Sequence, residues 1–141
     1  MDKKTKDYEA INITGINHQG MRANTPLKRL TATSIIGDKV VNRKGEHLGK
    51  IHNLMINLRS GMVEYAIIEF GGFLGVGEKL FAIPFHELTV DEKNEVFVMD
   101  RDKDYLKDSP GFDPMHWPDT NDHVYFDDVN SYYQYPVTPF P

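Results

Sequence analysis

The side chains best suited to acid–base or metal chemistry in this sequence are six histidines, at positions 18, 47, 52, 86, 116 and 123. No two of them have the i, i+4 spacing that brings a pair of imidazoles onto one face of a helix as metal ligands. His47 and His52 are five residues apart on a predicted strand, so they point to opposite faces. His86 and Glu87 could act as acid and base, but no nucleophile or third group accompanies them. The sequence predicts no catalytic residue and no metal site.

A glycine-rich segment, Gly72–Lys79, nearly has the spacing of a phosphate-binding loop. Its lysine comes one residue late, no serine or threonine follows, and the next residues, Leu80–Ile83, are typical of a strand. Without a helix N-terminus, a phosphate has no dipole to bind. We therefore expect an ordinary loop between two strands here.

The acidic segment Asp100-Arg-Asp102-Lys-Asp104 imitates the beginning of a calcium-binding loop. Such a loop requires glycine at its sixth position and glutamate at its twelfth, where this chain has Tyr105 and Gly111. A solvent-exposed exit from a strand explains the segment better, and Asp102 is also placed to cap a following helix. We expect no metal here.

The charge balance excludes a general electrostatic attraction to phosphate. The sequence has 16 basic and 21 acidic side chains and a formal net charge of -5, which repels nucleic acid and anionic membranes at long range. It contains no cysteine, so disulfides, thiolate metal sites and cysteine nucleophiles are excluded. No stretch resembles a signal peptide or approaches the roughly 20 apolar residues of a membrane span. We expect a cytoplasmic protein with no cofactor, no nucleic-acid partner and no direct membrane insertion.

Three regions differ in composition. Residues 1–33 are polar, with no sustained period, and form an arm that we expect to be mobile. Residues 34–100 are dense in β-branched and aromatic residues punctuated by glycine, which indicates the folded core. Residues 101–141 are rich in proline and tyrosine and contain the single tryptophan, Trp117. We expect this C-terminal extension to dock on the core or on a neighbouring subunit.

The core is predicted to consist of short strands separated by polar or glycine-containing turns. Predicted strands run over Lys39–Asn42, His47–Leu58, Met62–Phe70, Lys79–Phe85 and Glu95–Asp100. The third of these is apolar almost throughout, which is typical of a strand covered on both faces or sharply coiled in a small barrel. A turn at His86–Leu88 and one short helix at Lys103–Leu106 are the helical segments expected. The pattern predicts an all-β barrel or sandwich and disfavours a parallel nucleotide-binding sheet.

A family resemblance rests on a succession of glycines and apolar residues in the same region. The succession is Ile36-Gly37, Val40, Gly45, Leu48-Gly49-Lys50-Ile51, Ile56-Asn57, Gly61, Val63 and Tyr65-Ala66-Ile67-Ile68. It resembles the PRC-barrel family, which is named for the cytoplasmic domain of the photosynthetic reaction centre H subunit. The block Phe70–Pro84 is the most distinctive part. This block and the later segments Pro110–Asp113, His116–Pro118 and Ser131–Tyr133 are similar to a bacterial single-domain branch of the family.

The resemblance implies a small PRC-type β-barrel over residues 34–100 with a proline- and aromatic-rich C-terminal extension. Members of this family bind protein partners or assemble, and no shared catalytic residues define them. One departure is that this chain has Asn53 and Asn57 where family members often carry aspartate. The favoured function is therefore a non-enzymatic binding or scaffolding module. Its protein partner is not specified by the sequence, and self-association into a homodimer or higher homo-oligomer is included among its expected contacts.

The expected contact surface combines two groups of apolar side chains. Phe73, Leu74 and Val76 belong to the loop Gly71–Gly77, and they are either exposed or folded back over the mouth of the barrel; the sequence leaves both arrangements open. Trp117 precedes a proline in a segment whose prolines restrict the backbone. We expect it to strap the extension to the barrel, and the alternative is a hook for a partner.

Two other functions are kept as alternatives. One is an accessory subunit of a membrane-associated, electron-transfer-like complex, which would have to dock through a partner because the chain has no predicted transmembrane helix. The other is a factor in RNA or ribosome assembly, since a barrel of this family is paired with ribosome maturation in other proteins. We expect neither the second domain nor the basic charge that this last role would favour.

Overall fold

The computed structural model describes residues 29–70, 78–119 and 123–134 of the chain. The elements in order are α2 (Ala32–Ile35), β1 (Lys39–Val41), β2 (His47–Ile56), β3 (Val63–Phe70), β4 (Lys79–Pro84), η1 (Phe85–Glu87), β5 (Leu88–Asp91), β6 (Val96–Met99), α3 (Lys103–Lys107), β7 (Gly111–Phe112) and α4 (His123–Tyr132). Most of the predicted N-terminal arm, residues 1–28, and the whole loop Gly71–Gly77 lie outside the described residues.

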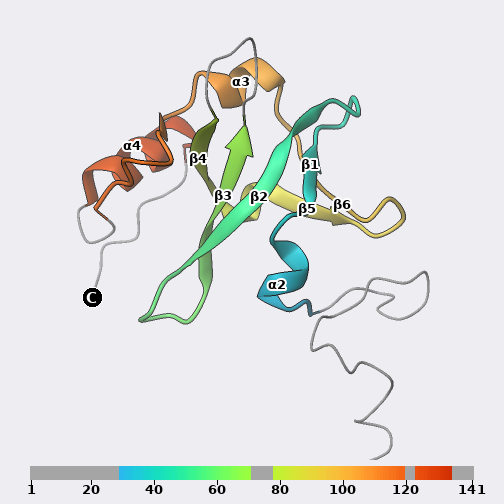
Figure 1. Cartoon of the computed structure of the whole chain (residues 1–141), viewed down its shortest axis with the longest axis horizontal. Helices are drawn as coiled ribbons and strands as arrows, with labels where there is room; N and C mark the ends of the chain where they lie inside the picture. Colours follow the sequence, from blue (N-terminus) through green and yellow to red (C-terminus); the bar gives the residue numbers. More distant parts are fainter. Residues whose placement is uncertain (1–28, 71–77, 120–122, 135–141) are drawn as a thin grey trace, which may run out of the picture.

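Within the described residues, seven strands form one sheet in the order β5-β6-β1-β2-β3-β4-β7. Strands β1 and β6 are parallel, and every other neighbouring pair is antiparallel. The sheet coils so strongly that β5 and β6 cross β2 and β3 at a steep angle (Figure 1). Strong coiling is how a small sheet encloses a core of its own side chains. The predicted small all-β barrel is thereby confirmed.

Short polar turns end the strands where the sequence predicts them. The side-chain oxygen of Asn42 accepts hydrogen bonds from the N–H groups of Lys44 at 3.0 Å and Glu46 at 2.9 Å, which closes the turn between β1 and β2. Gly45 in this turn has a φ of +81°, and Gly61 in the turn between β2 and β3 has a φ of +74°. These left-handed conformations favour glycine because it has no Cβ.

Strands β2 and β3 approach each other closely at Gly49. Its φ is +154°, and a Cβ at this position would collide with the main-chain carbonyl of Glu69. The missing side chain therefore allows the two strands to stay paired while the sheet coils.

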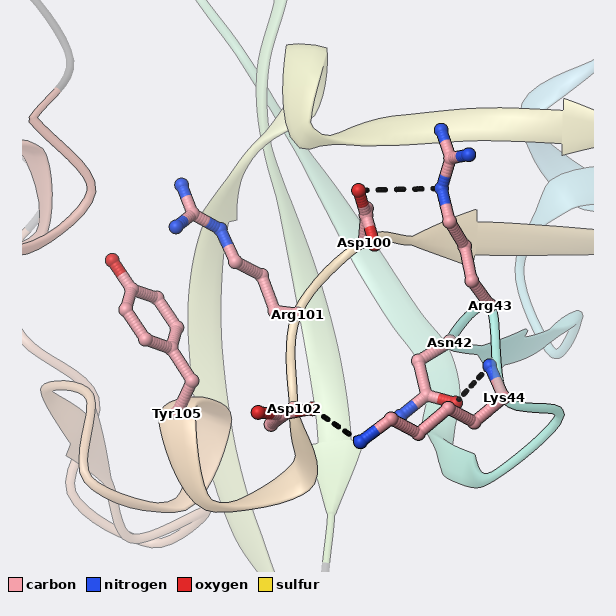
Figure 2. Close-up of a pocket in the computed structure, with 7 residues that line it drawn as sticks. All are labelled: Asn42, Arg43, Lys44, Asp100, Arg101, Asp102 and Tyr105. Carbon is pink, nitrogen blue, oxygen red and sulfur yellow. Dashed lines mark hydrogen bonds and ion pairs between the residues drawn. The ribbon is translucent and has the colours of Figure 1, made fainter.

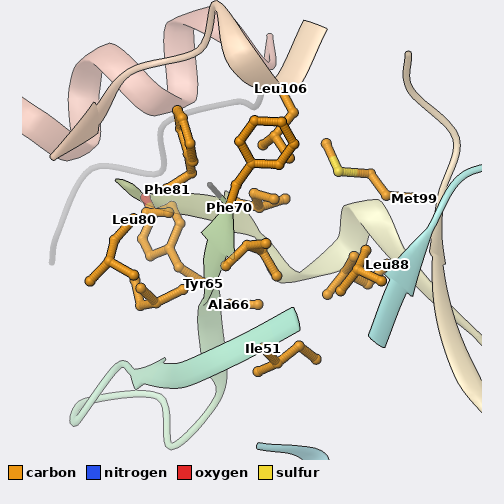
Figure 3. Packing of buried hydrophobic residues seen from close by; sticks show 14 of the residues in the cluster. Ile51, Tyr65, Ala66, Phe70, Leu80, Phe81, Leu88, Met99 and Leu106 are labelled. Atoms are coloured by element: carbon orange, nitrogen blue, oxygen red, sulfur yellow. The ribbon is translucent and has the colours of Figure 1, made fainter. Parts of the chain in front are cut away.

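Strand β3 is buried on both faces, as its apolar sequence predicts. Ala66 and Phe70 share one face and belong to the interior of the barrel, where Phe70 packs edge-on against Phe81 with ring centroids 6.0 Å apart (Figure 3). Tyr65 alternates with Ala66 and therefore lies on the opposite face, which α4 covers. The barrel thus has a core inside the sheet and a second layer of packing outside it.

The helices differ from the expectations. The predicted helical turn at His86–Leu88 lies one residue earlier, at Phe85–Glu87, and β5 follows it directly. The prediction of a single short helix is wrong, because α2 and α4 are helical as well. Within the last segment, Phe126, Val129 and Tyr133 have the spacing of a helix face and are buried. The residues between them include aspartate and asparagine, whose low helix propensity weakens this signal.

Candidate functional site

Helix α4 packs against the outer face of the barrel beside β4 (Figure 1). The hydroxyl of Tyr65 on β3 donates a buried hydrogen bond to Oδ1 of Asn130 on α4 at 2.8 Å. The ring of Tyr65 also lies 4.9 Å from the ring of Phe126, between centroids. Val129, one residue before Asn130, is fully buried. Residues of the C-terminal extension therefore belong to the same hydrophobic cluster as the strands.

The hydroxyl of Tyr125 closes the outer edge of β4. It accepts a hydrogen bond from the N–H of Ala82 at 3.1 Å and donates one to the carbonyl of Pro110 at 3.0 Å. The neighbouring positions on β4, Leu80 and Phe81, pair with β7. Burial of the phenol raises the pKa of Tyr125 to about 12. Tyr125 and β7 thus supply hydrogen-bond partners from the same chain to the main chain at this edge of the sheet.

A second set of polar contacts joins α4 to α3. Tyr105 donates its hydroxyl to the carbonyl of Tyr132 at 2.9 Å, and Tyr132 donates its hydroxyl to the carbonyl of Tyr105 at 2.6 Å. The guanidinium of Arg101 lies 4.4 Å from the centroid of the Tyr105 ring. It also donates to both carboxylate oxygens of Glu87, at 2.8 and 3.3 Å, and these bonds raise the pKa of Arg101. Glu87 is therefore engaged in an ion pair that joins η1 to the segment before α3.

Trp117 lies against the sheet but keeps part of its surface in solvent. Its ring centroid is 4.9 Å from that of Phe112 on β7 and 6.2 Å from that of His52 on β2, and the residue is 42% exposed. Asp113 holds the preceding turn, because its carboxylate accepts the N–H of Met115 at 2.8 Å. The side chain of Met115 is 83% exposed. An aromatic ring fixed on one side and open on the other is suited to contact with a second molecule.

The other predicted contact residues are not placed by the structure. Phe73, Leu74 and Val76 lie in the loop Gly71–Gly77, outside the described residues. That they belong to the contact surface therefore stays a prediction.

A second exposed apolar group lies at the end of the β2–β3 hairpin and was missed by the sequence reasoning. Ile56 is 51% exposed, Leu58 93% and Met62 68%. The sequence holds a partial signal, because two large apolar residues flank the tight turn around Gly61, where polar residues are usual, but this pattern does not distinguish exposure from burial under another segment.

A shallow pocket with a volume of about 350 Å³ lies between the β1–β2 turn and the segment before α3, and its lining residues are drawn in Figure 2. Its lining residues are Asn42, Arg43, Lys44, Asp100, Arg101, Asp102 and Tyr105. Arg43 Nε lies 3.2 Å from Asp100 Oδ2, and Lys44 Nζ lies 3.3 Å from Asp102 Oδ1. Two carboxylates of the calcium-like segment, those of Asp100 and Asp102, are therefore paired with cations of the same chain. These pairs are exposed, so each contributes little to stability.

The candidate acid–base pair is also part of the ion-pair arrangement. His86 Nε2 lies 3.6 Å from Glu87 Oε2, the same carboxylate that Arg101 binds. Across residues 29–70, 78–119 and 123–134, no group of three or more histidine, aspartate or glutamate side chains is arranged to hold a metal ion. In the same part of the chain, no helix has the length and apolar character needed to cross a membrane.

Comparison with known proteins identifies the barrel. No curated protein matches the chain. Among solved structures, the chain is similar to a protein described as a 16S ribosomal RNA processing protein, RimM, from Pseudomonas aeruginosa, with 18% identity and a TM-score of 0.38. The match covers 57% of this chain and 48% of that protein, so the chain spans about half of its length. A model of the PRC-barrel domain matches residues 28–106, more than half of the sequence, and encloses the predicted barrel. The chain belongs to the PRC-barrel domain family.

Proposed function

We propose that this protein is a non-enzymatic binding module that acts through protein–protein contacts, with Trp117 at the centre of its contact surface. The observation that carries the proposal is the half-exposed indole held between Phe112 and His52, with the exposed Met115 beside it. Tryptophan is the residue type most enriched at energetically dominant positions of protein interfaces. Phe73, Leu74 and Val76 extend this surface in the proposal.

The fixed position of Trp117 supports the proposal energetically. The ring packs on Phe112, and the turn before it is closed by Asp113. A side chain that is already ordered loses little conformational entropy when a partner covers it. A freely rotating aromatic residue on a loop would lose more.

The arrangement of the charged groups supports a non-enzymatic role. Glu87 is held by Arg101, and Asp100 and Asp102 are paired with Arg43 and Lys44. An acid–base catalyst needs a group that is free to exchange a proton with a substrate. Glu87 and Asp102 instead accept hydrogen bonds from Arg101 and Lys44, and Asp100 forms an ion pair with Arg43.

Quantitative affinity capture from an extract of the source cells tests the proposal. The bait is the full chain, compared with Met115→Ser, which removes an exposed apolar side chain without opening the core. Val90→Thr, an exposed apolar position on β5, is the matched control. We expect a protein captured by the wild type and by the control to be depleted with Met115→Ser. Equal capture by all three baits would contradict the proposed surface.

The same capture distinguishes the two other functions. Subunits of a membrane-embedded electron-transfer complex among the depleted proteins would identify an accessory subunit. Ribosomal proteins or ribosomal RNA that are lost after nuclease treatment would identify a role in RNA or ribosome assembly.

A further inference from the structure

The negative charge of this protein is concentrated in its C-terminal part. All 16 lysines and arginines lie before position 108. Residues 108–141 hold six aspartates and no other charged side chain apart from histidine; they are Asp108, Asp113, Asp119, Asp122, Asp127 and Asp128. This segment alone therefore makes the net charge negative. A surface of one sign attracts a partner of the opposite sign.

The surface around Trp117 belongs to this acidic segment. Asp113 follows Phe112, on which the indole packs, and the side chain of Asp113 is 62% exposed. Phe112 also contacts Tyr125 edge-on, with ring centroids 5.4 Å apart. Asp128 is exposed and lies three residues after Tyr125, about one turn further along α4. The half-exposed indole is therefore part of an acidic surface.

The lysine nearest in sequence to the indole's contact on β2 is paired within the sheet. His52, whose ring centroid is 6.2 Å from that of Trp117, places Nδ1 3.7 Å from Oε1 of Glu69. Lys50, two residues earlier, places Nζ 3.6 Å from Oε2 of the same carboxylate. The side chain of Glu69 is only 18% exposed. The charges of Lys50 and Glu69 therefore cancel, and the aspartates of the segment set the sign of the surface.

The chain already contains one arginine that is held by an aromatic ring and a carboxylate together. The guanidinium of Arg101 lies 4.4 Å from the centroid of the Tyr105 ring (Figure 2), and Glu87 accepts its hydrogen bonds at 2.8 and 3.3 Å. A planar guanidinium uses its face for the ring and its N–H groups for the carboxylate. Tryptophan attracts a cation more strongly than tyrosine does. An exposed indole beside a carboxylate therefore offers both contacts to an arginine from another molecule.

We propose that the Trp117 surface binds an arginine-rich segment of a partner protein. One arginine of that segment stacks on the exposed part of the indole and pairs with the carboxylate of Asp113. This inference rests on the proposed function, because it names the chemical class of the partner at the same surface.

The distribution of charge favours this partner over others. The aspartates repel nucleic acid and anionic membranes. A second copy of the chain would bring its own acidic segment to the contact. A purely apolar partner would remove water from Asp113 without supplying a hydrogen bond or an opposite charge. A basic segment is complementary to both the ring and the carboxylates.

The contact is modest in strength because its charged groups are exposed. Individual ion pairs in water contribute little and are weakened further by salt. Several arginines that meet several aspartates act together, because the first contact holds the others close to their sites. A repeated basic sequence should therefore bind more tightly than a single arginine.

A short, fluorescently labelled peptide of alternating arginine and glycine, titrated with the full chain, tests the proposal. At low ionic strength, fluorescence anisotropy should rise to saturation with the wild type, and the affinity should fall as salt is added. A peptide with lysine in place of arginine should bind more weakly, because an ammonium group lacks the planar face that stacks on a ring. A peptide with glutamate in place of arginine should not bind.

Three variants locate the contact, and circular dichroism verifies that each one folds. Trp117→Leu keeps an apolar side chain but removes the ring, so it should weaken binding of the arginine peptide by about fivefold. Asp113→Asn keeps an oxygen that accepts the Met115 N–H but removes the charge, so it should weaken binding by about threefold. Glu92→Gln is the matched control, because it removes the same charge from the turn between β5 and β6, on the opposite side of the molecule from α4 (Figure 1). It should leave the affinity nearly unchanged.

The emission of Trp117, the single tryptophan, should change as the arginine peptide saturates the wild type, because the indole loses contact with water. Absence of saturable binding would overturn the inference. Equal binding of the arginine peptide by Trp117→Leu and the wild type would also overturn it. The same holds if Glu92→Gln weakens binding as much as Asp113→Asn does, since binding would then follow net charge alone.

The peptide titration and the affinity capture fail independently. Depletion of a captured protein by Met115→Ser, combined with no binding of the arginine peptide, would contradict the arginine-rich partner alone. Peptide binding that requires Trp117, combined with equal capture by all three baits, would contradict the proposed protein contact alone.

Discussion

The barrel treats two of its strand edges in opposite ways. Along β4, the chain supplies β7 and the hydroxyl of Tyr125 to the edge, and α4 covers the adjoining face. Along the end of β2, Asn53–Ile56 has no second strand within the described residues, and apolar side chains beside it are exposed. The C-terminal extension thus completes the sheet on one side. The same chain closes the edge of β4 and leaves the end of β2 open. The exposure of apolar side chains is therefore confined to the end of the β2–β3 hairpin and is not a general property of the sheet edges.

The largest expected loss of stability comes from the side of the barrel where α4 packs beside β4. Phe126→Ala removes a buried ring that packs against Tyr65, and it should lower the free energy of unfolding by about 3–5 kcal/mol. Urea denaturation followed by circular dichroism measures the change. A loss of less than about 1 kcal/mol would show that α4 does not contribute to the barrel's stability.

The closed edge should also make stability depend on alkaline pH. The folded-state pKa of Tyr125 is raised from 10.0 to about 12 by burial, so the unfolded chain loses this proton first. The stabilising contribution is complete below pH 10 and is lost as the pH rises towards 12, a fall of roughly 2–3 kcal/mol over the window. The difference between urea titrations of the wild type and Tyr125→Phe isolates this group from the other tyrosines. If the free energy of unfolding fell with rising pH equally in the two proteins, the raised pKa would not belong to Tyr125.

Tyr125→Phe at neutral pH examines the hydrogen bonds of the same edge. The phenylalanine keeps the ring but leaves the Ala82 N–H and the Pro110 carbonyl without this partner, which should cost about 1–3 kcal/mol. Thermal unfolding measures the change, and amide exchange at Ala82 should accelerate. Unchanged exchange at Ala82 would mean that another group satisfies this donor.

A smaller loss is expected where the extension is only partly buried. The ring of Trp117 packs on Phe112 but keeps much of its surface in solvent. Trp117→Ala should therefore cost about 1–2 kcal/mol, less than a fully buried indole. Chemical denaturation measures this, and the emission maximum of the single tryptophan in the wild type should lie between those of a buried and a free indole. A fully red-shifted emission would show that the ring does not rest on Phe112.

The smallest effect on stability is expected at the open hairpin. Leu58 is almost fully exposed, so Leu58→Ser should change the free energy of unfolding of the monomer by less than about 0.5 kcal/mol. Urea denaturation followed by circular dichroism measures the change. A large loss of monomer stability would mean that Leu58 packs within its own chain.

The strands could be predicted from the sequence more fully than the site. The turns at Gly45 and Gly61 and the doubly buried strand β3 follow from local residue types, because turn chemistry and alternation act over a few neighbouring positions. Helix α4 could have been found from the period of Phe126, Val129 and Tyr133. The exposure of Leu58 could not be inferred in the same way, since an apolar residue near a turn is equally compatible with burial under another segment.

By itself, the sequence determined the family, the order of the main strands and the absence of cysteine chemistry, because these depend on composition and on short-range patterns. Only the tertiary structure decided where the C-terminal extension packs and which edge it completes. The hydrogen bond from Tyr65 to Asn130 joins residues 65 positions apart, and no local pattern encodes such a pairing. It forms because the folded sheet presents an outer apolar face and an unpaired edge at the distance that α4 can reach.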